Sequence, residues 1–173
     1  MADAVLDGDR DAFRILVERE QGVVYRACLR IMGRPHDAED VAQESFVIAY
    51  RSLGSWRGDG PLGAWLLRIA TRQAFRRLGQ RRDAVELSPD LPIGAPRSDP
   101  LAATLAGERQ RSVRLAVAAL GEPYREVVAL RFFGELTLDE IASVTQRPLN
   151  TVKTHLRRGL ERLRGTLAAE ATP

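Results

Sequence analysis

The sequence has few of the residues that build catalytic, metal or disulfide sites. Its 173 residues include one cysteine, Cys28, and two histidines, His36 and His155. A single cysteine cannot form an internal disulfide, and with two distant histidines it cannot complete a four-ligand zinc site. No phosphate-binding glycine loop is visible, nor any pairing of a Ser or Cys nucleophile with His and a supporting acid. The sequence therefore predicts a protein that is not an enzyme and that has no metal, no cofactor and no catalytic residues.

Long hydrophobic runs are also missing. No stretch approaches the roughly 18 apolar residues that a membrane span needs. The N-terminal residues are acidic, whereas a signal peptide begins with basic ones. The content of 45% hydrophobic and 28% charged residues is ordinary for a globular protein. We expect a cytoplasmic location with no membrane insertion.

The charges are unevenly distributed, although the formal net charge is only +3. Residues 68–82 contain six arginines and no acid, and residues 83–108 contain five acids and one arginine. Residues 147–164 contain six basic residues and one acid. Two basic blocks thus flank an acidic segment, which indicates two separate nucleic-acid faces.

Helical periodicity dominates the chain and predicts an all-α fold. Apolar residues recur at steps of three and four, and strict alternation is nearly absent. We expect helical stretches near residues 12–17, 24–31, 37–53, 62–78, 105–120, 124–133, 137–144 and 151–167.

A proline-rich segment divides these helices into two groups. Residues 83–107 contain four prolines with acidic and small residues between them, a composition that resists helix formation. A long loop inside one domain is the alternative, but structureless loops of this length are uncommon in compact folds. We therefore predict two small helical domains, residues 1–82 and 108–173, joined by a flexible acidic linker.

Residues 137–167 have the pattern of a helix-turn-helix. Thr137 and Glu140 have the spacing of a capping box, which would start a short first helix. After a turn, Asn150 or Thr151 can cap a second, amphipathic helix. Small polar residues at its N-terminal end would suit base edges in a major groove, and the cations beside them would suit phosphates. A solvated surface helix is the alternative. The predicted DNA-binding residues are Arg147, Thr151, Lys153, Thr154, His155, Arg157 and Arg158.

A second basic surface is predicted around residues 55–82. Arginines repeat every four residues along the helix predicted at 62–78, with no acid at neighbouring turns of that helix. Trp56 and Trp65 bracket a glycine-rich turn. Trp65 is more readily explained as a core residue, and Trp56, beside Arg57, is the better candidate for stacking on a base. Cations with neighbouring aromatic rings are typical of single-stranded nucleic-acid binding. The predicted residues are Trp56, Arg57, Trp65, Arg68, Arg72 and Arg76.

An acidic cluster, DAEDVAQESF at residues 37–46, begins the third helical stretch. The helix macrodipole favours anions in a first turn, which explains one or two of the carboxylates. The remainder indicates a polar surface for a protein partner. The predicted partner-binding residues are Asp37, Glu39, Asp40, Gln43 and Glu44.

Five motifs in this order resemble a bacterial RNA polymerase sigma factor of the extracytoplasmic-function group. They cover nearly the whole chain except the linker and tail. The motifs are DGDRDAF (7–13), DAEDVAQESF (37–46), WLLRIATRQAF (65–75), EPYREVVALRFFGELTLDEIA (122–142) and TVKTHLRRGLERLR (151–164).

The resemblance implies a promoter-specificity subunit with no chemistry of its own. Its first domain would bind the clamp helices of the polymerase β′ subunit through residues 37–46. It would also read and help open the −10 element through the glycine-rich turn and the basic helix that follows. The second domain would read the −35 element. An anti-sigma factor is a further partner that the resemblance implies.

The chain departs from the common family pattern at several positions. Arg72 and Arg76 stand where Asn and Asp are often found, and Gln146 and Asn150 stand where Gly is common. Gln146 must then adopt a left-handed turn conformation at some energetic cost. A stand-alone helix-turn-helix regulator is one alternative function, and a helical protein-interaction module without a direct DNA role is another.

Overall fold

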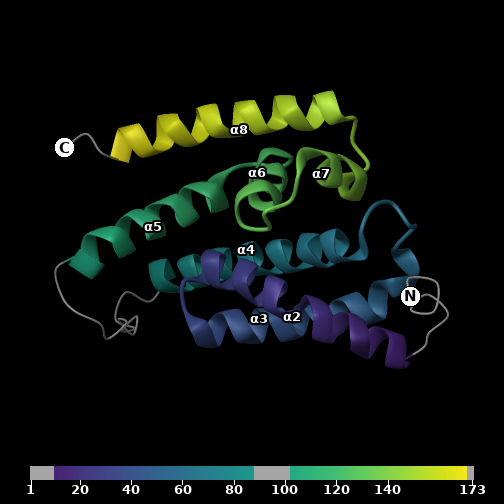
Figure 1. The fold of residues 1–173 in the computed structure, drawn as a ribbon. Helices are drawn as coiled ribbons and strands as arrows, with labels where there is room; N and C mark the ends of the chain where they lie inside the picture. The colour runs from purple at the N-terminus through teal and green to yellow at the C-terminus, as the bar shows by residue number, and fades with distance from the viewer. Residues whose placement is uncertain (1–9, 88–101, 171–173) are drawn as a thin grey trace.

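The structure, a computed structural model, describes residues 10–87 and 102–170, and all regular structure in these residues is helical (Figure 1). The N-terminal half consists of α2 (Arg10–Met32), α3 (Pro35–Ser52), the 3-10 turn η1 (Leu53–Ser55) and α4 (Leu62–Leu87). The C-terminal half consists of α5 (Ala102–Ala119), α6 (Tyr124–Phe132), α7 (Leu138–Thr145) and α8 (Leu149–Glu170). The all-α prediction is confirmed. Among the described helices, none combines the length and the apolar character needed to cross a bilayer.

The first two predicted helical stretches form one helix, α2. The buried residues Leu16, Val24 and Ile31 keep a helical phase across Gly22, so one apolar stripe runs the length of the helix. A single glycine inside a helix costs only about 1 kcal/mol relative to alanine, which this burial outweighs. The prediction of two stretches was therefore wrong, and Gly22 does not end a helix.

The helices on either side of the predicted linker are longer than expected. Helix α4 continues to Leu87 and α5 begins at Ala102, so both ends of the 83–107 segment are helical. All four prolines of the segment lie between these ends. Because a proline disfavours helical geometry in the residue before it, α4 can extend almost to Pro89. The flexible linker was predicted over residues 83–107, and the rest of it, residues 88–101, lies outside the described residues.

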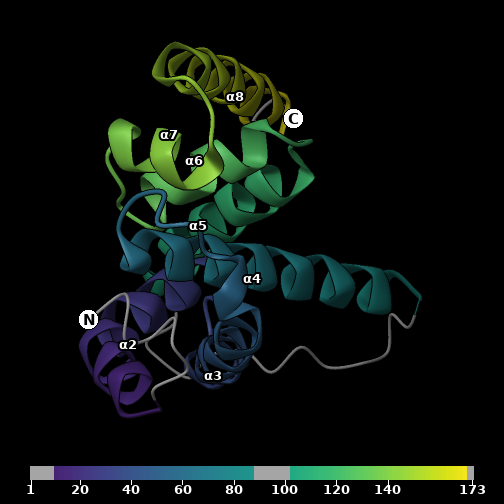
Figure 2. The same ribbon diagram turned by 90° about the vertical axis from the view of Figure 1, so that its right-hand side faces the viewer.

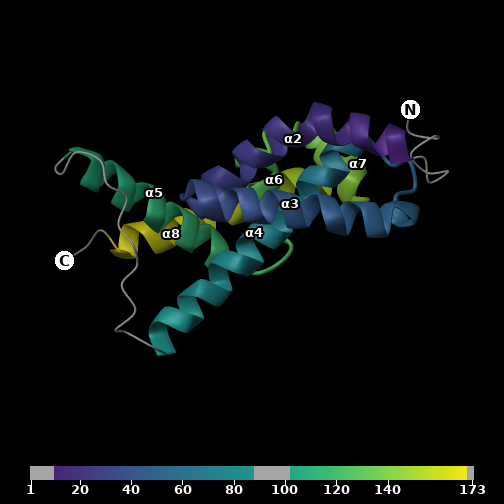
Figure 3. The same ribbon diagram turned by 90° about the horizontal axis from the view of Figure 1, so that it is seen from below.

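Helix α4 lies between the two halves of the chain. It contacts α2 and α3 on one side and α6 and α7 on the other, while α8 is the outermost helix and covers α6 and α7 (Figures 1 and 2). Seen from below, the C-terminal part of α4 projects away from the α2–α3 pair (Figure 3). The helix of the predicted basic surface is thus also the central helix of the fold.

The hydrophobic core is continuous between the halves. Phe75 of α4 and Phe133, the residue after α6, are both buried and make an edge-to-face contact with ring centroids 5.5 Å apart. The Arg30 guanidinium of α2 donates a hydrogen bond to the Phe133 carbonyl at 3.2 Å. The two halves therefore pack directly against each other, which the sequence did not predict.

The helix-turn-helix has the predicted capping box. The Thr137 hydroxyl accepts a hydrogen bond from the Glu140 amide, and the Glu140 carboxylate accepts one from the Thr137 amide. Gln146 ends α7 in the left-handed conformation, with φ 55°, as predicted. Helix α8 begins earlier than expected, because the amides of Thr151 and Val152 both bond to the Pro148 carbonyl. The prediction that Asn150 or Thr151 caps this helix was therefore wrong.

Removing the capping hydroxyl should measurably destabilise the chain. We expect Thr137→Ala to lower the free energy of unfolding by about 1 kcal/mol, because the first turn of α7 then leaves the Glu140 amide without its acceptor. Urea unfolding monitored by circular dichroism measures this change. Thr137→Ser keeps the hydroxyl and is the matched control. An alanine variant as stable as the serine variant would contradict the expectation.

The single cysteine should be chemically inert in the folded protein. Cys28 is buried in α2, and this burial raises the pKa of its thiol to about 12. Because the thiolate is the nucleophile, we expect iodoacetamide at pH 8 to leave the folded protein unmodified and to alkylate it fully in urea. Mass spectrometry distinguishes the two outcomes. Rapid alkylation of the folded chain would show that the α2 packing opens readily.

Candidate nucleic-acid interface

Helix α8 is amphipathic in the predicted way. Val152 and Leu163 are buried against the rest of the C-terminal half. Lys153, Arg157 and Arg158 are exposed on α8. The half-buried residues Thr151 and Thr154 lie near its N-terminal end. This arrangement leaves a cationic, solvent-facing surface on a helix whose other side is fixed by packing, as major-groove recognition requires.

Two of the predicted α8 residues contact other side chains of the protein. Arg157 forms an ion pair with Glu161 one turn later at 2.7 Å. The His155 ring packs edge-to-face on Tyr124, with centroids 5.7 Å apart, and its Nδ1 is buried without a hydrogen-bond partner in the described part of the chain. Burial, followed by the charges of Arg147 and Arg158, lowers the pKa of His155. The imidazole is therefore neutral at pH 7 and adds no charge to this surface.

The second predicted surface surrounds a polar cavity of about 350 Å³ at the glycine-rich turn. Trp56, Trp65 and Arg72 line it, together with Arg57 and Arg68 from the same half of the chain. Trp56 follows η1 in an extended conformation, and its indole Nε1 is buried with no hydrogen-bond partner among the described residues. The structure thus brings five of the six predicted residues to one cavity that contains two aromatic rings and three cations.

The sixth residue, Arg76, lies one turn further along α4. It pairs with Glu44 of α3 at 3.4 Å, and Arg77 approaches the same carboxylate at 4.0 Å. Arg81 pairs with Asp37. Among the α4 side chains that the structure describes, none is an acidic partner of the arginine stripe, but α3 supplies acidic partners for its C-terminal part.

The acidic cluster of α3 is consequently divided between two environments. Asp37 and Glu44 face α4 through these ion pairs. Glu39, Asp40 and Gln43 are exposed, and Asp40 lies 3.4 Å from the His36 imidazole. Three of the five predicted partner-binding residues therefore remain on an open surface.

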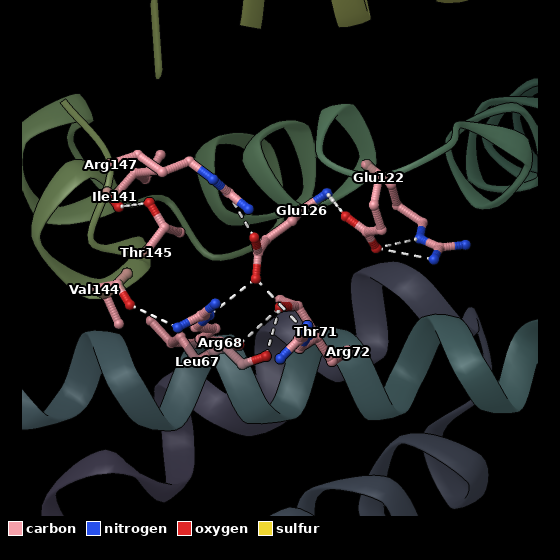
Figure 4. A network of polar contacts seen from close by, with 11 residues as sticks. Leu67, Arg68, Thr71, Arg72, Glu122, Glu126, Ile141, Val144, Thr145 and Arg147 are labelled. Atoms are coloured by element: carbon pink, nitrogen blue, oxygen red, sulfur yellow. Dashed lines mark hydrogen bonds and ion pairs between the residues drawn. The ribbon is translucent and has the colours of Figure 1, made fainter. Parts of the chain in front are cut away.

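A buried acid, Glu126 of α6, links the two predicted DNA-binding surfaces (Figure 4). One carboxylate oxygen accepts a hydrogen bond from Arg68 Nε at 2.9 Å and lies 3.7 Å from Arg72 Nε. The other oxygen accepts one from Arg147 Nη1 at 2.7 Å. Burial opposes ionisation of Glu126, but the hydrogen bonds and charges of Arg68 and Arg147 outweigh it and hold its pKa below the ordinary value. The carboxylate is therefore an anion at pH 7.

Sequence reasoning missed Glu126. Its side chain is only 3% exposed and it precedes the buried run Val127–Leu130. An acid directly before such an apolar run is a usable signal, since a buried charge needs a partner. The pattern could not identify Arg68 as that partner, because the two residues are 58 positions apart.

Two family models match the chain. Residues 16–83 match Sigma-70 region 2 and residues 110–163 match Sigma-70 region 4. Among curated proteins, the chain is 32% identical to the ECF RNA polymerase sigma factor SigW of Bacillus subtilis, over 94% of this chain and 92% of that protein. It is 34% identical to the ECF RNA polymerase sigma-E factor of Escherichia coli, over 93% and 89% respectively.

Solved structures share the fold. CnrH, in complex with the cytosolic domain of CnrY, superposes with a TM-score of 0.58 at 24% identity, over 98% of this chain and 96% of that chain. The sigma factor RpoE of Bartonella quintana, in complex with the anti-sigma factor NepR, superposes with a TM-score of 0.53 at 17% identity, over 94% and 99%. The arrangement of helices is thus one that other chains also adopt.

Proposed function

This chain belongs to the sigma-70 family of RNA polymerase sigma factors, in the extracytoplasmic-function group, and from this premise we propose which of its surfaces meet promoter and polymerase. It is a transcription initiation factor that binds core RNA polymerase and directs it to specific promoters. Family membership favours this role over that of a stand-alone regulator. The residues that carry it are the subject of the proposal.

The −35 element is read by α8. The observation that carries this assignment is the exposure of Lys153, Arg157 and Arg158 on a helix whose opposite side is fixed in a helix-turn-helix. Thr151 and Thr154 at the N-terminal end are placed to approach base edges, and the cations further along to approach phosphates. His155 is neutral and half-buried, so its role is to position α8 against Tyr124 and to offer at most an uncharged ring edge.

The −10 element is read by the cavity at the glycine-rich turn. Trp56 and Trp65 provide ring faces on which an unpaired base can stack, while Arg57 and Arg72 follow the strand backbone. A polar cavity of about 350 Å³ has room for a single extruded base. Arg68 and Arg76 add positive charge along the same helix.

The polymerase binds the exposed part of the α3 acidic cluster. Glu39, Asp40 and Gln43 form a polar surface on the opposite side of α4 from the C-terminal half. We propose that this surface binds the clamp helices of the β′ subunit. The matched residues 16–83 and 110–163 act as two domains in this assignment; the second match lies within the predicted domain 108–173, and the first ends one residue beyond the predicted domain 1–82.

The remaining features follow from the same role. The polymerase performs the chemistry, so the chain needs no catalytic residue, cofactor or metal, and it acts in the cytoplasm where the polymerase is. Its structural neighbour RpoE was solved with an anti-sigma factor. We propose an anti-sigma factor as the regulator of this chain as well.

Run-off transcription with purified core polymerase tests the proposal. The chain should give a promoter-dependent product from a candidate promoter such as its own, and core polymerase alone should not. Tight sequence-specific DNA binding by the isolated protein, with no such product, would instead support a stand-alone regulator. Absence of both activities would support a protein-interaction module.

A further inference from the structure

Tyr124, the first residue of α6, contacts α8 although it belongs to neither predicted DNA-binding surface. Its ring packs edge-to-face with the His155 ring, with centroids 5.7 Å apart and planes at 80°. The Arg162 guanidinium carbon lies 4.3 Å from the centroid of the same Tyr124 ring, which is the geometry of a cation–π contact. His155 and Arg162 are about two helical turns apart, so a single side chain of α6 holds α8 at two separate points.

A glycine between these two contacts brings α6 and α8 close together. Gly159 is buried on α8, and a Cβ atom added there would lie 2.9 Å from Val128 Cγ2 and 3.5 Å from Tyr124 Cβ. A larger residue at this position would therefore displace Val128. Residues 155, 159 and 162 are spaced by four and three positions, so they lie on one side of α8. That side is packed closely against α6, beginning at Tyr124.

Both contacts of the Tyr124 ring depend on orientation. The ring has a negative face and a positive edge, so an edge-to-face pair and a cation over the face are favourable only in particular geometries. Burial of an apolar side chain such as Val152, by contrast, has no directional preference. The contacts at His155 and Arg162 therefore oppose rotation and tilting of α8, which apolar burial alone would oppose less.

The cations assigned to the −35 element lie on the adjoining sides of α8. Successive residues of a helix are about 100° apart, so Arg158 projects from α8 about 100° away from Gly159, and Arg157 projects about 160° away. Both arginines are exposed. A binding constellation must be held within about 0.5 Å and 10–20° of its productive geometry. A larger rotation of α8 would move these side chains away from DNA although all of them were still present.

We propose that Tyr124 is a positioning residue for promoter recognition, which holds His155 and Arg162 and thereby fixes the rotation of α8 against the −35 element. The inference rests on the proposed assignment of α8 to that element. It also assigns Arg162 to the Tyr124 ring and not to a DNA phosphate, although this guanidinium is exposed on α8. Neither Tyr124 nor Arg162 contacts DNA in this role.

The contact with His155 can be tested by nuclear magnetic resonance of the free full-length chain. The chain has two histidines, so His36→Gln leaves His155 as the only imidazole signal. Burial, followed by the charges of Arg147 and Arg158, lowers the pKa of His155. We expect Tyr124→Leu to uncover the imidazole, raise its pKa toward the ordinary value and shift its ring-proton resonances. Tyr124→Phe keeps the ring and should change neither. An unaltered His155 in the leucine variant would overturn the inference.

Promoter binding by the holoenzyme gives the second measurement. Two duplex fragments are compared, one with a promoter that gives a run-off product and one in which only the −35 element of that promoter is scrambled. Tyr124→Leu should reduce the preference for the intact fragment about tenfold, which corresponds to the loss of one well-placed base contact. Tyr124→Phe should retain the preference.

Two outcomes of this comparison would contradict the positioning role. An equal loss of binding to both fragments in Tyr124→Leu would indicate a general loss of folding or of phosphate contacts, and not a rotated helix. A Tyr124→Phe variant as defective as the leucine variant would assign the effect to the hydroxyl group and not to the ring.

Arg162→Gln is an independent variant at an exposed position, should the leucine variant fail to fold. It removes the cation from the Tyr124 ring and should lower the preference for the intact −35 element about threefold, with the slope of log K against log salt unchanged. Loss of a phosphate contact would instead weaken binding to both fragments equally and lower this slope by about 1, and that result would overturn the assignment of Arg162.

Run-off transcription by the parent protein separates this inference from the proposed function. If no promoter gives a product, the promoter function fails and the −35 role of Tyr124 fails with it. The resonance measurement on the free chain is unaffected by that result, and it decides whether the Tyr124 ring holds α8.

Discussion

Replacing both Arg157 and Arg158 with alanine should reduce promoter-dependent transcription about 100-fold. Both guanidinium groups are exposed on the outer surface of α8, where they are assigned to phosphates of the −35 element. A hydrogen bond to a charged group contributes about 1.5 kcal/mol, so the loss of two amounts to about 3 kcal/mol. At 1.4 kcal/mol for each factor of ten, this corresponds to about two orders of magnitude in promoter affinity.

The salt dependence of promoter binding should also change in the double alanine variant. Each phosphate contact releases condensed counterions, so losing two contacts should lower the slope of log K against log salt by about 2. Arg157 must exchange its ion pair with Glu161 for a phosphate, and this exposed pair is weak enough to allow it. Run-off transcription and holoenzyme binding to promoter fragments at several salt concentrations measure both effects.

A second pair of arginines supplies the control for charge alone. Arg109 and Arg111 are exposed on α5 and belong to no proposed DNA-binding surface. Their double alanine variant changes the net charge equally and should keep both transcription and the salt slope close to those of the parent. If the α5 and α8 variants behave alike, then α8 contacts DNA no more than the rest of the surface does.

The sequence predicted best those features that depend on residues close together in the chain. The capping box at Thr137 needs only Glu140, three residues later, and both of its hydrogen bonds are present. The apolar side of α8 follows from a repeat of three and four residues, and Val152 and Leu163 are buried as this repeat indicates. Gln146 adopts the left-handed conformation because the turn geometry demands it, whichever side chain is present.

Features that depend on residues far apart in the sequence could not be predicted from its periodicity. The sequence shows no acid at the turns of α4 next to Arg68, Arg72 and Arg76, yet Glu126 and Glu44 reach these arginines from α6 and α3. Their separations of 58 and 32 residues leave no periodic signal. The packing of Phe75 on Phe133 is of the same kind. Sequence analysis therefore identified the two cationic surfaces but not the acid that joins them.

The second large effect is expected at the −10 cavity, where Trp56→Ala should impair promoter opening more than promoter binding. Trp56 lines the cavity on the turn before α4, and stacking of one base on an aromatic ring contributes about 1–3 kcal/mol. We therefore expect transcription from a duplex promoter to fall by about 10- to 100-fold. The loss should arise at the step in which a base leaves the duplex.

A premelted template separates opening from every other function of Trp56. If the −10 region is already unpaired, the cost of extruding the base has been removed, and the alanine variant should recover most of its activity. Trp56→Phe keeps an aromatic face and should retain most activity on both templates. It also controls for packing, because Trp56 is half-buried against the core. An alanine variant equally defective on duplex and premelted templates would place the role of Trp56 in folding or polymerase binding, since only a stacking role predicts rescue by melting the DNA in advance.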